Sequence, residues 1–89
     1  MNVEFKDSFA KDLKSVKDKG LLQCVKDVIE SVDKANSLSE IQNLKKLKGS
    51  GNFYRLRVGD FRIGISSRNN TVIFIRFLDR KDIYKHFPT

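Results

Sequence analysis

The chain has 89 residues, of which 39% are hydrophobic and 33% are charged, and its formal net charge is +7. This length allows one domain with one core and excludes two domains. No apolar run reaches the roughly 18 to 20 residues that span a bilayer, the first residues lack the pattern of a secretory signal, and a single cysteine excludes an internal disulfide. We therefore expect one domain over residues 1–89, a cytoplasmic location, no membrane partner, no cofactor and no metal site.

The first half of the chain is predicted to hold one strand and two helices. Residues 3–5 alternate between apolar and polar, as in a short strand. A helix capped by Asp7 or Ser8 should follow and end at Gly20. A second helix should begin near Leu21, because apolar residues then recur at helical spacing: Leu21, Leu22, Val25, Val28, Ile29 and Val32.

The two helices are expected to run antiparallel, because the join at Gly20 is short. Cys24 lies beside the apolar stripe of the second helix, and we expect it at the edge of the core rather than in a reactive role. Residues 37–52 are predicted to be a connection with one helical turn near Ser39.

The second half changes to the alternation of strands. Three strands are predicted, at 53–58, 61–66 and 71–78. Tight turns join them at Gly59-Asp60 and Asn69-Asn70. The third strand is apolar on both faces, as expected of a central strand. The polar segment 79–89 should form a turn and a docked tail. The fold class is therefore α+β: two N-terminal antiparallel helices packed on one face of a small, mainly antiparallel sheet of three to four strands.

The two-residue turn at 59–60 predicts the register of the first hairpin. Arg57 then faces Arg62 and Arg55 faces Gly64, while the apolar residues of both strands collect on the other face. Like charges that face each other across a strand pair destabilise it by up to about 1 kcal/mol. A sheet built only for stability would not oppose two arginines.

Two interpretations of these arginines remain open. In the structural one, they pair with Asp79 or Asp82, or their stems cover Phe53. In the functional one, they form an anion site on an exposed face of the sheet, where Gly64 leaves room for a ligand.

Positive charge is concentrated in the second half of the chain. Residues 1–44 carry seven Lys or Arg and eight Asp or Glu, whereas residues 45–89 carry eleven Lys or Arg and three Asp. A polyanion is the expected partner, although basic surfaces also serve solubility. The candidate RNA-binding residues are Lys45, Lys46, Lys48, Arg76, Lys81 and Lys85.

The tail contains residue types that bind RNA and transfer protons. Phe87 is predicted to anchor the tail, and Tyr84 either to anchor it or to act in the site. His86, the only histidine, is a candidate acid or base.

The order of elements, together with "YRLRVGDFRIGI", "NNTVIFIRFL" and "RKDIYKHFP", resembles the RelE/ParE superfamily of bacterial and archaeal type II toxins. The likeness covers nearly the whole chain, is strongest over residues 47–88, and is greater to the RelE branch than to the ParE branch. It implies a microbial RNase-like fold and a ribosome-dependent endoribonuclease that cleaves mRNA without metal or cofactor. It also implies a cognate antitoxin, the ribosome and mRNA as partners.

The resemblance also implies catalytic residues. Arg55 and Arg57 fall at basic positions of the first hairpin strand, Arg62 at the arginine that holds the phosphate, Arg80 at a late basic position and Tyr84 at the C-terminal tyrosine. Some relatives have lysine at the first two positions, and arginine essentially cannot give up its proton, so the general base stays open. Close relatives of this subtype tend to have histidine at position 79, where this chain has aspartate, so Asp79, Tyr84 and His86 all stay open as the proton donor or acceptor.

Two other functions remain as alternatives. A ParE-like toxin would inhibit DNA gyrase without cutting nucleic acid, and a protein whose catalysis has been lost would be an RNA-binding or regulatory module. An overlapping gene for a partner protein would favour either toxin over the third alternative, and mapping of mRNA ends in cells distinguishes the two toxins.

Overall fold

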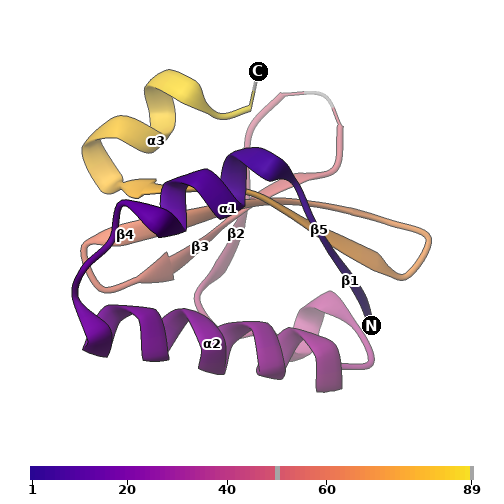
Figure 1. Cartoon of the computed structure of the whole chain (residues 1–89). Coiled ribbons are helices and arrows are strands. Elements are labelled where there is room, and N and C mark those ends of the chain that lie inside the picture. Colours follow the sequence, from indigo (N-terminus) through magenta and orange to yellow (C-terminus); the bar gives the residue numbers. More distant parts are fainter. Residues whose placement is uncertain (50, 89) are drawn as a thin grey trace.

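The computed structural model describes residues 1–49 and 51–88, and this part of the chain forms a five-stranded sheet with three α-helices (Figure 1). The strands lie in the order β1-β5-β4-β3-β2, with β1 parallel to β5 and the other neighbours antiparallel. The predicted α+β class is confirmed, with five strands in place of three to four. The elements are β1 (Asn2–Phe5), α1 (Asp7–Lys14), α2 (Lys19–Lys34), a 3-10 turn (Leu38–Glu40), β2 (Leu44–Lys46), β3 (Phe53–Val58), β4 (Phe61–Arg68), β5 (Thr71–Asp79) and α3 (Arg80–His86).

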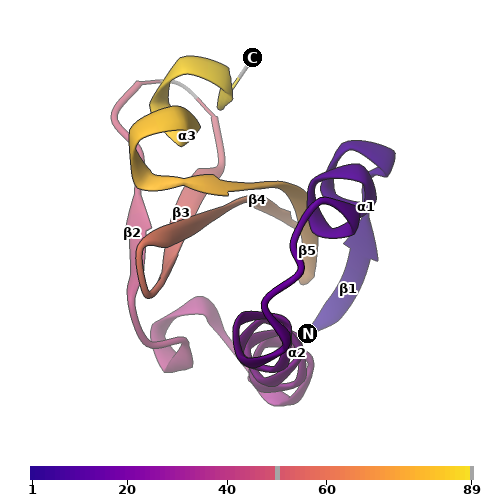
Figure 2. The same ribbon diagram turned by 60° about the vertical axis from the view of Figure 1, so that its left-hand side comes forward.

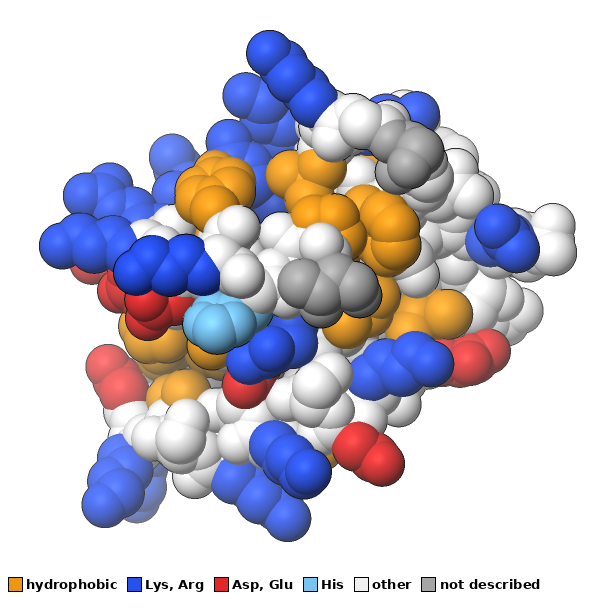
Figure 3. All heavy atoms as spheres, turned by 90° about the horizontal axis from the view of Figure 1, so that it is seen from above, with side chains coloured by type: hydrophobic (Ala, Val, Ile, Leu, Met, Phe, Trp, Pro, Cys, Tyr) orange, Lys and Arg blue, Asp and Glu red, His pale blue; other side chains and the backbone are white. Residues whose placement is uncertain are grey.

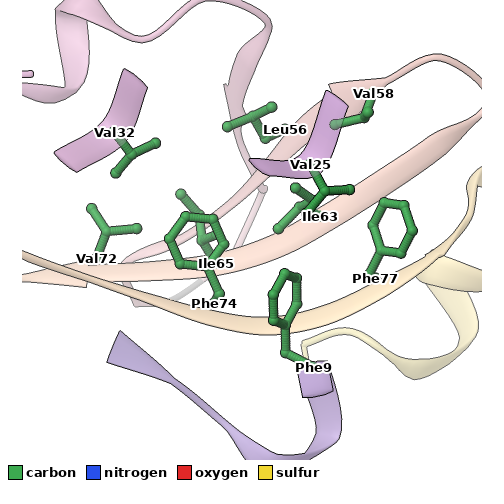
Figure 4. Packing of buried hydrophobic residues seen from close by; sticks show 10 residues of the cluster. All are labelled: Phe9, Val25, Val32, Leu56, Val58, Ile63, Ile65, Val72, Phe74 and Phe77. Atoms are coloured by element: carbon green, nitrogen blue, oxygen red, sulfur yellow. The ribbon is translucent and has the colours of Figure 1, made fainter. Parts of the chain in front are cut away.

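The core lies between the sheet and the two N-terminal helices. Phe9 of α1 and Val25 and Val32 of α2 meet strand residues such as Ile63 and Phe74 in one buried cluster (Figure 4). Figure 1 shows α1 and α2 running in opposite directions, as the short join predicts, and Figure 2 shows α3 on the other side of the sheet from α2. The face of the sheet turned toward α3 is therefore the one that does not carry the main core.

The boundary between the first two helices differs from the sequence prediction. α1 ends at Lys14, and α2 begins at Lys19 with Gly20 inside its first turn, so the expectation that Gly20 ends the first helix is wrong. The reason is Asp18, whose carboxylate accepts hydrogen bonds from the backbone N–H groups of Gly20 at 2.9 Å and Leu21 at 3.1 Å and so caps α2.

Cys24 is exposed, so its expected place at the edge of the core is also wrong. The buried residues of α2 are Val25 and Val32, seven positions apart on one helical face, and Cys24 precedes the first of them. The predicted helical turn near Ser39 is confirmed by the 3-10 turn.

The strand boundaries mostly agree with the prediction. β3 spans the predicted residues, β4 extends to Arg68 and β5 to Asp79. The apolar β5 lies inside the sheet between β1 and β4, although the middle strand is β4. None of the helices within residues 1–49 and 51–88 is long and apolar enough to cross a membrane.

Two elements differ from the expected connection and tail. Leu44–Lys46 forms the edge strand β2, where exposed lysines are tolerated because an edge strand has one solvated side. The polar segment after β5 forms α3. The Asp79 carboxylate caps this helix by accepting a hydrogen bond from the Lys81 N–H at 2.8 Å, and Ile83, on the inner side of the helix, is buried. The predicted anchor Phe87 is confirmed, with 5% of its surface exposed.

Helix α1 covers the edge of β5 beyond the end of β1. The Ser8 hydroxyl donates to the carbonyl oxygen of Ile75, and the Asp12 carboxylate accepts from the backbone N–H of Phe77 at 2.9 Å. Asp12 also binds Arg76 through two nitrogen atoms, at 2.8 and 3.2 Å. This hydrogen bond, which outweighs the partial burial, raises the pKa of Arg76 above its ordinary value.

We expect an Asp12→Ala variant to lose about 2 to 3 kcal/mol of the free energy of unfolding. The substitution removes the acceptor of both the Arg76 guanidinium and the Phe77 N–H, and the Asp12 side chain is only 13% exposed. Urea denaturation monitored by circular dichroism measures the loss. Asp7→Ala, in the exposed first turn of the same helix, is the control and should cost no more than about 1 kcal/mol. Equal losses in the two variants would show that the Asp12 contacts contribute nothing specific.

Candidate functional site

The β3–β4 hairpin has the register that the turn at 59–60 predicts. Arg57 pairs with Arg62, Arg55 with Gly64 and Leu56 with Ile63. Leu56 and Ile63 are buried in the core, so the arginines lie on the opposite face of the sheet. The prediction that Arg57 and Arg62 face each other across the strands is confirmed.

The three arginines of the hairpin line one hollow, which we call the arginine hollow. It has a volume of about 280 Å³ and is lined by Asn43, Arg55, Arg57 and Arg62. The Arg62 guanidinium is held in place through Nη1, which donates to the carbonyl oxygens of Gly59 at 3.0 Å and Phe61 at 2.9 Å. In the described residues no carboxylate lies within ion-pairing distance of these three arginines. Three guanidinium groups facing an open hollow without acidic partners favour an anion site over the structural network with Asp79 or Asp82.

Tyr84 of α3 contacts this site from above the sheet. Arg55 donates from Nη1 to the Tyr84 hydroxyl, and its guanidinium carbon lies 5.3 Å from the centre of the Tyr84 ring. Tyr84 is 57% exposed, so it does not anchor the tail in the core. The structure therefore places its phenol group against Arg55, one of the residues that line the arginine hollow.

The space above Gly64 is occupied by the tail. A Cβ atom at Gly64 would lie 2.7 Å from Cγ and Cδ2 of the Phe87 ring. The expectation that Gly64 leaves room for a ligand is therefore wrong, because Phe87 fills that room. The arginine hollow lies instead at Arg55, Arg57 and Arg62.

A second hollow, the lysine hollow, adjoins the first and shares Arg55 with it. It has a volume of about 370 Å³, and lies between the segment that follows β2 and the C-terminal tail. Its lining comprises Lys45, Lys46, Lys48, Arg55 and Tyr84 together with the apolar Leu47, Phe87 and Pro88. On the face that carries α3, Lys and Arg side chains surround a group of hydrophobic side chains (Figure 3).

The other predicted proton-transfer residues lie away from the arginine hollow. The Asp79 carboxylate caps α3, and in the strand register Asp79 pairs with Phe61, which faces the core. His86 lines a different hollow of about 240 Å³, beside Arg76 and on the far side of Phe87. Among the three candidates, the Tyr84 hydroxyl accepts a hydrogen bond from Arg55, an arginine of the hollow.

The remaining predicted basic residues are distributed around the site. Arg80 begins α3 beside the hairpin turn, where its N–H donates to the carbonyl oxygen of Asp60 at 2.9 Å, and it does not line the arginine hollow. Lys81 and Lys85 lie on α3 and are exposed. Arg76 faces the same side as the arginine hollow, because it pairs with Gly64, but it is held by Asp12.

Asn43 is a lining residue that the sequence analysis did not select. It has a positive φ of 64°, and its carbonyl oxygen accepts from the Arg57 N–H at 3.1 Å, which continues the pairing of β2 with β3. Asn43 therefore lines the hollow together with the three arginines. Asparagine is one of the few residues that tolerate this backbone conformation, but that signal alone does not distinguish a site residue from a turn residue.

Comparison with known proteins places this arrangement in a family. The family described as "ParE toxin of type II toxin-antitoxin system, parDE" matches residues 3–84. The chain belongs to the RelE/ParE family of type II toxins. Toxin RelE3 of Methanocaldococcus jannaschii is 45% identical over 89 residues, which cover 99% of this toxin and all of the relative.

Solved structures of relatives agree with the fold of this RelE/ParE-family toxin. The RelB-RelE antitoxin-toxin complex from Methanococcus jannaschii contains a chain with a TM-score of 0.81 and 44% identity, covering 96% of this toxin and 99% of that chain. The RelE-RelB complex from Pyrococcus horikoshii OT3 contains one with a TM-score of 0.73 and 22% identity, covering 89% and 93%. At that lower identity the second comparison supports the fold alone.

Proposed function

We propose that this type II toxin is a ribosome-dependent endoribonuclease that cleaves mRNA, with residues 1–89 acting as one toxin domain. The observation that carries the proposal is the arginine hollow, in which Arg55, Arg57 and Arg62 face a space large enough for a phosphate group and have no acidic partner within residues 1–49 and 51–88. The Tyr84 hydroxyl lies against the first of these arginines. The family relation to Toxin RelE3 supports the same activity.

The proposed reaction is an internal transfer within the RNA. The 2′-oxygen attacks the adjacent phosphorus, the bond from phosphorus to the 5′-oxygen breaks, and the products are a 2′,3′-cyclic phosphate and a 5′-hydroxyl. The 2′-hydroxyl loses one proton and the 5′-oxygen gains one. Negative charge builds up on the phosphorane oxygens, and guanidinium groups held by a rigid sheet can stabilise it without reorganising.

Each residue then has a role in the proposed site. Arg57 and Arg62 bind the scissile phosphate from opposed positions on two strands, and the repulsion between them is relieved when the anion binds. Arg55 links the phosphate to Tyr84, which transfers a proton. The RNA backbone lies along a positive surface that Arg80 and five lysines supply. These lysines are Lys45, Lys46, Lys48, Lys81 and Lys85. Arg76 contributes long-range charge only, because Asp12 holds its guanidinium.

Two substitutions at Asp79 separate its capping role from a role as general base. Asp79→Asn keeps an N-cap acceptor of similar quality for the Lys81 N–H, and we expect it to retain both stability and cleavage. Asp79→Ala removes the cap and should cost about 1 kcal/mol of the free energy of unfolding. Denaturation curves and cleavage assays with purified ribosomes measure both effects. A large loss of cleavage in the asparagine variant, with stability retained, would instead make Asp79 the base.

The partners follow from the same proposal. In the two archaeal complexes the related toxins are bound to RelB antitoxins. We expect this toxin to bind a cognate antitoxin of that kind, through acidic residues that cover the basic face of the β3–β4 hairpin. Such antitoxin segments commonly fold on binding. Co-expression with the antitoxin should restore growth, and the salt dependence of the complex measures its electrostatic part.

The second candidate function is inhibition of DNA gyrase. It is favoured by one observation, namely that the matching family over residues 3–84 is described as a ParE toxin. Expression of the toxin in cells, followed by mapping of mRNA 5′ ends, distinguishes the two. Codon-phased new ends with intact DNA support the endoribonuclease, whereas DNA breaks with intact mRNA support the gyrase inhibitor. Binding to RNA without either product would leave the third alternative, a regulatory RNA-binding module.

A further inference from the structure

Position 64 requires a glycine because the C-terminal tail packs directly against it, whereas the backbone conformation there does not require one. It lies inside β4, and its φ is not in the left-handed region that favours glycine. A Cβ atom there would lie 2.7 to 2.8 Å from Cγ, Cδ1 and Cδ2 of Phe87, three neighbouring atoms of one ring. The Phe87 ring therefore rests with its face on the Gly64 backbone, and any side chain at this position would displace it.

Phe87 is fixed in this place by contacts on several sides. It meets Phe53 edge to face, with ring centres 5.6 Å apart at 88°, and only 5% of its surface is exposed. Its N–H donates to the carbonyl oxygen of Ile83 at 2.8 Å, and Ile83 itself is 2% exposed. Ile83 and Phe87, one helical turn apart, are thus the two residues that hold α3 against the sheet.

Tyr84 follows Ile83 directly but has no comparable anchor, since it is 57% exposed and contacts Arg55. Arg55 is the cross-strand partner of Gly64. The place where Phe87 rests and the place where Tyr84 meets an arginine are therefore neighbours on the same face of the sheet. How closely α3 approaches Gly64 determines where the Tyr84 hydroxyl lies relative to the arginine hollow.

We propose that Gly64 and Phe87 are positioning residues for Tyr84: the ring of Phe87, seated on Gly64, places the Tyr84 hydroxyl against Arg55 for the proton transfer. Neither residue touches RNA in this scheme. The proposal rests on the proposed function for its effect on cleavage, but the placement of Tyr84 can be measured in the free toxin.

The kinetic test uses Gly64→Ala, Phe87→Ala and the double variant in a ribosome cleavage assay. An added methyl group forces the ring outward by roughly 1 Å to regain ordinary contact, and a displacement of this size can cost about 100-fold in rate. We expect kcat to fall about that much in each single variant, with KM changed less than about threefold because the arginines remain. The double variant should be no slower than Phe87→Ala alone, since the added methyl group then meets no ring.

Val32→Ala is the matched control for stability. This substitution removes buried side-chain atoms of α2 and leaves a cavity in the core, away from the C-terminal tail. It should destabilise the toxin without changing kcat at a temperature where the variant is folded. Multiplicative losses in the double variant, a change in KM alone, or an equal loss of kcat in Val32→Ala would each overturn the proposal. If Gly64→Ala does not fold, Phe87→Leu, which keeps an apolar anchor but not the flat ring, is used in its place and should show the same fall in kcat.

A second measurement separates this proposal from the proposed function. The chain has two tyrosines and no tryptophan, so a Tyr54→Phe background leaves Tyr84 as the only tyrosine. We expect Gly64→Ala in that background to shift the NMR signals of the Tyr84 ring and to increase quenching of its fluorescence by acrylamide, whereas Val32→Ala changes neither. If the parent toxin cleaves no mRNA but the Tyr84 signals respond, the proposed function fails and the positioning remains. If the signals do not respond, the positioning is wrong whatever the toxin cleaves.

Discussion

An Arg62→Ala variant is expected to cleave mRNA roughly 10²- to 10³-fold more slowly than the parent toxin, which is the usual cost of losing one preorganised donor to a developing oxyanion. Arg62 lines the arginine hollow, and its guanidinium is oriented by two backbone carbonyl groups, so no other residue can take its place without movement. In cells, the same variant should no longer arrest growth. Single-turnover cleavage on purified ribosomes measures the rate.

The fold of this variant should be retained. Removing Arg62 gives up hydrogen bonds to Gly59 and Phe61 that are worth about 0.5 to 1.5 kcal/mol each. It also removes the repulsion with Arg57, worth up to about 1 kcal/mol. These effects oppose each other, and together they leave an expected loss of about 0 to 3 kcal/mol in the free energy of unfolding, which is less than the roughly 5 to 15 kcal/mol that stabilise a typical domain.

Arg68→Ala is the matched control, because it removes the same side chain and the same charge from the exposed end of the same strand. We expect it to retain cleavage within about threefold, apart from a small effect of net charge on RNA binding. If Arg68→Ala loses as much activity as Arg62→Ala, the loss reflects charge alone. If Arg62→Ala unfolds, the opposed arginines serve the structure of the hairpin and the anion site is the wrong interpretation.

The hairpin shows which features the sequence could predict. Alternating apolar residues and a Gly-Asp turn determine the register, because a slip by one residue would bury arginines. This register then places Arg55, Arg57 and Arg62 on one exposed face. The position of Tyr84 could not be predicted in this way, because its contact with Arg55 joins residues 29 apart that no local pattern connects.

Elements dominated by charge were harder to predict. In β2 the lysines hide the alternation that marks a strand, since an edge strand can leave its outer side in water. In α3 the signal was present, an aspartate cap followed by buried residues at 83 and 87, but seven residues are too few for a strong helical period. The contact between Asp12 and Arg76 spans 64 positions and depends on how α1 covers the edge of β5, which only the folded sheet reveals.

Removal of the Tyr84 hydroxyl is expected to slow cleavage more than the removal of any other single polar atom. Tyr84→Phe keeps the ring over the Arg55 guanidinium and removes only the oxygen to which Arg55 donates. If this group transfers the proton, cleavage should slow by about 10²- to 10⁴-fold, as for other general acids and bases. RNA binding should be almost unchanged, since Arg55, Arg57 and Arg62 remain. Single-turnover rates and ribosome-bound RNA affinity measure the two quantities separately.

Tyr54→Phe is the control for this substitution. It makes the same chemical change in the other tyrosine of the chain, which pairs with Ile65 and packs against the core, so it should leave the rate unchanged. A slow Tyr84→Phe variant beside a fast Tyr54→Phe variant assigns the effect to the hydroxyl that Arg55 contacts. If Tyr84→Phe cleaves at the parent rate while His86→Ala or Asp79→Asn is slow, proton transfer belongs to that residue. In that case cleavage does not need the hydrogen bond from Arg55 to Tyr84, and the ring contact that survives the substitution is enough to hold Arg55.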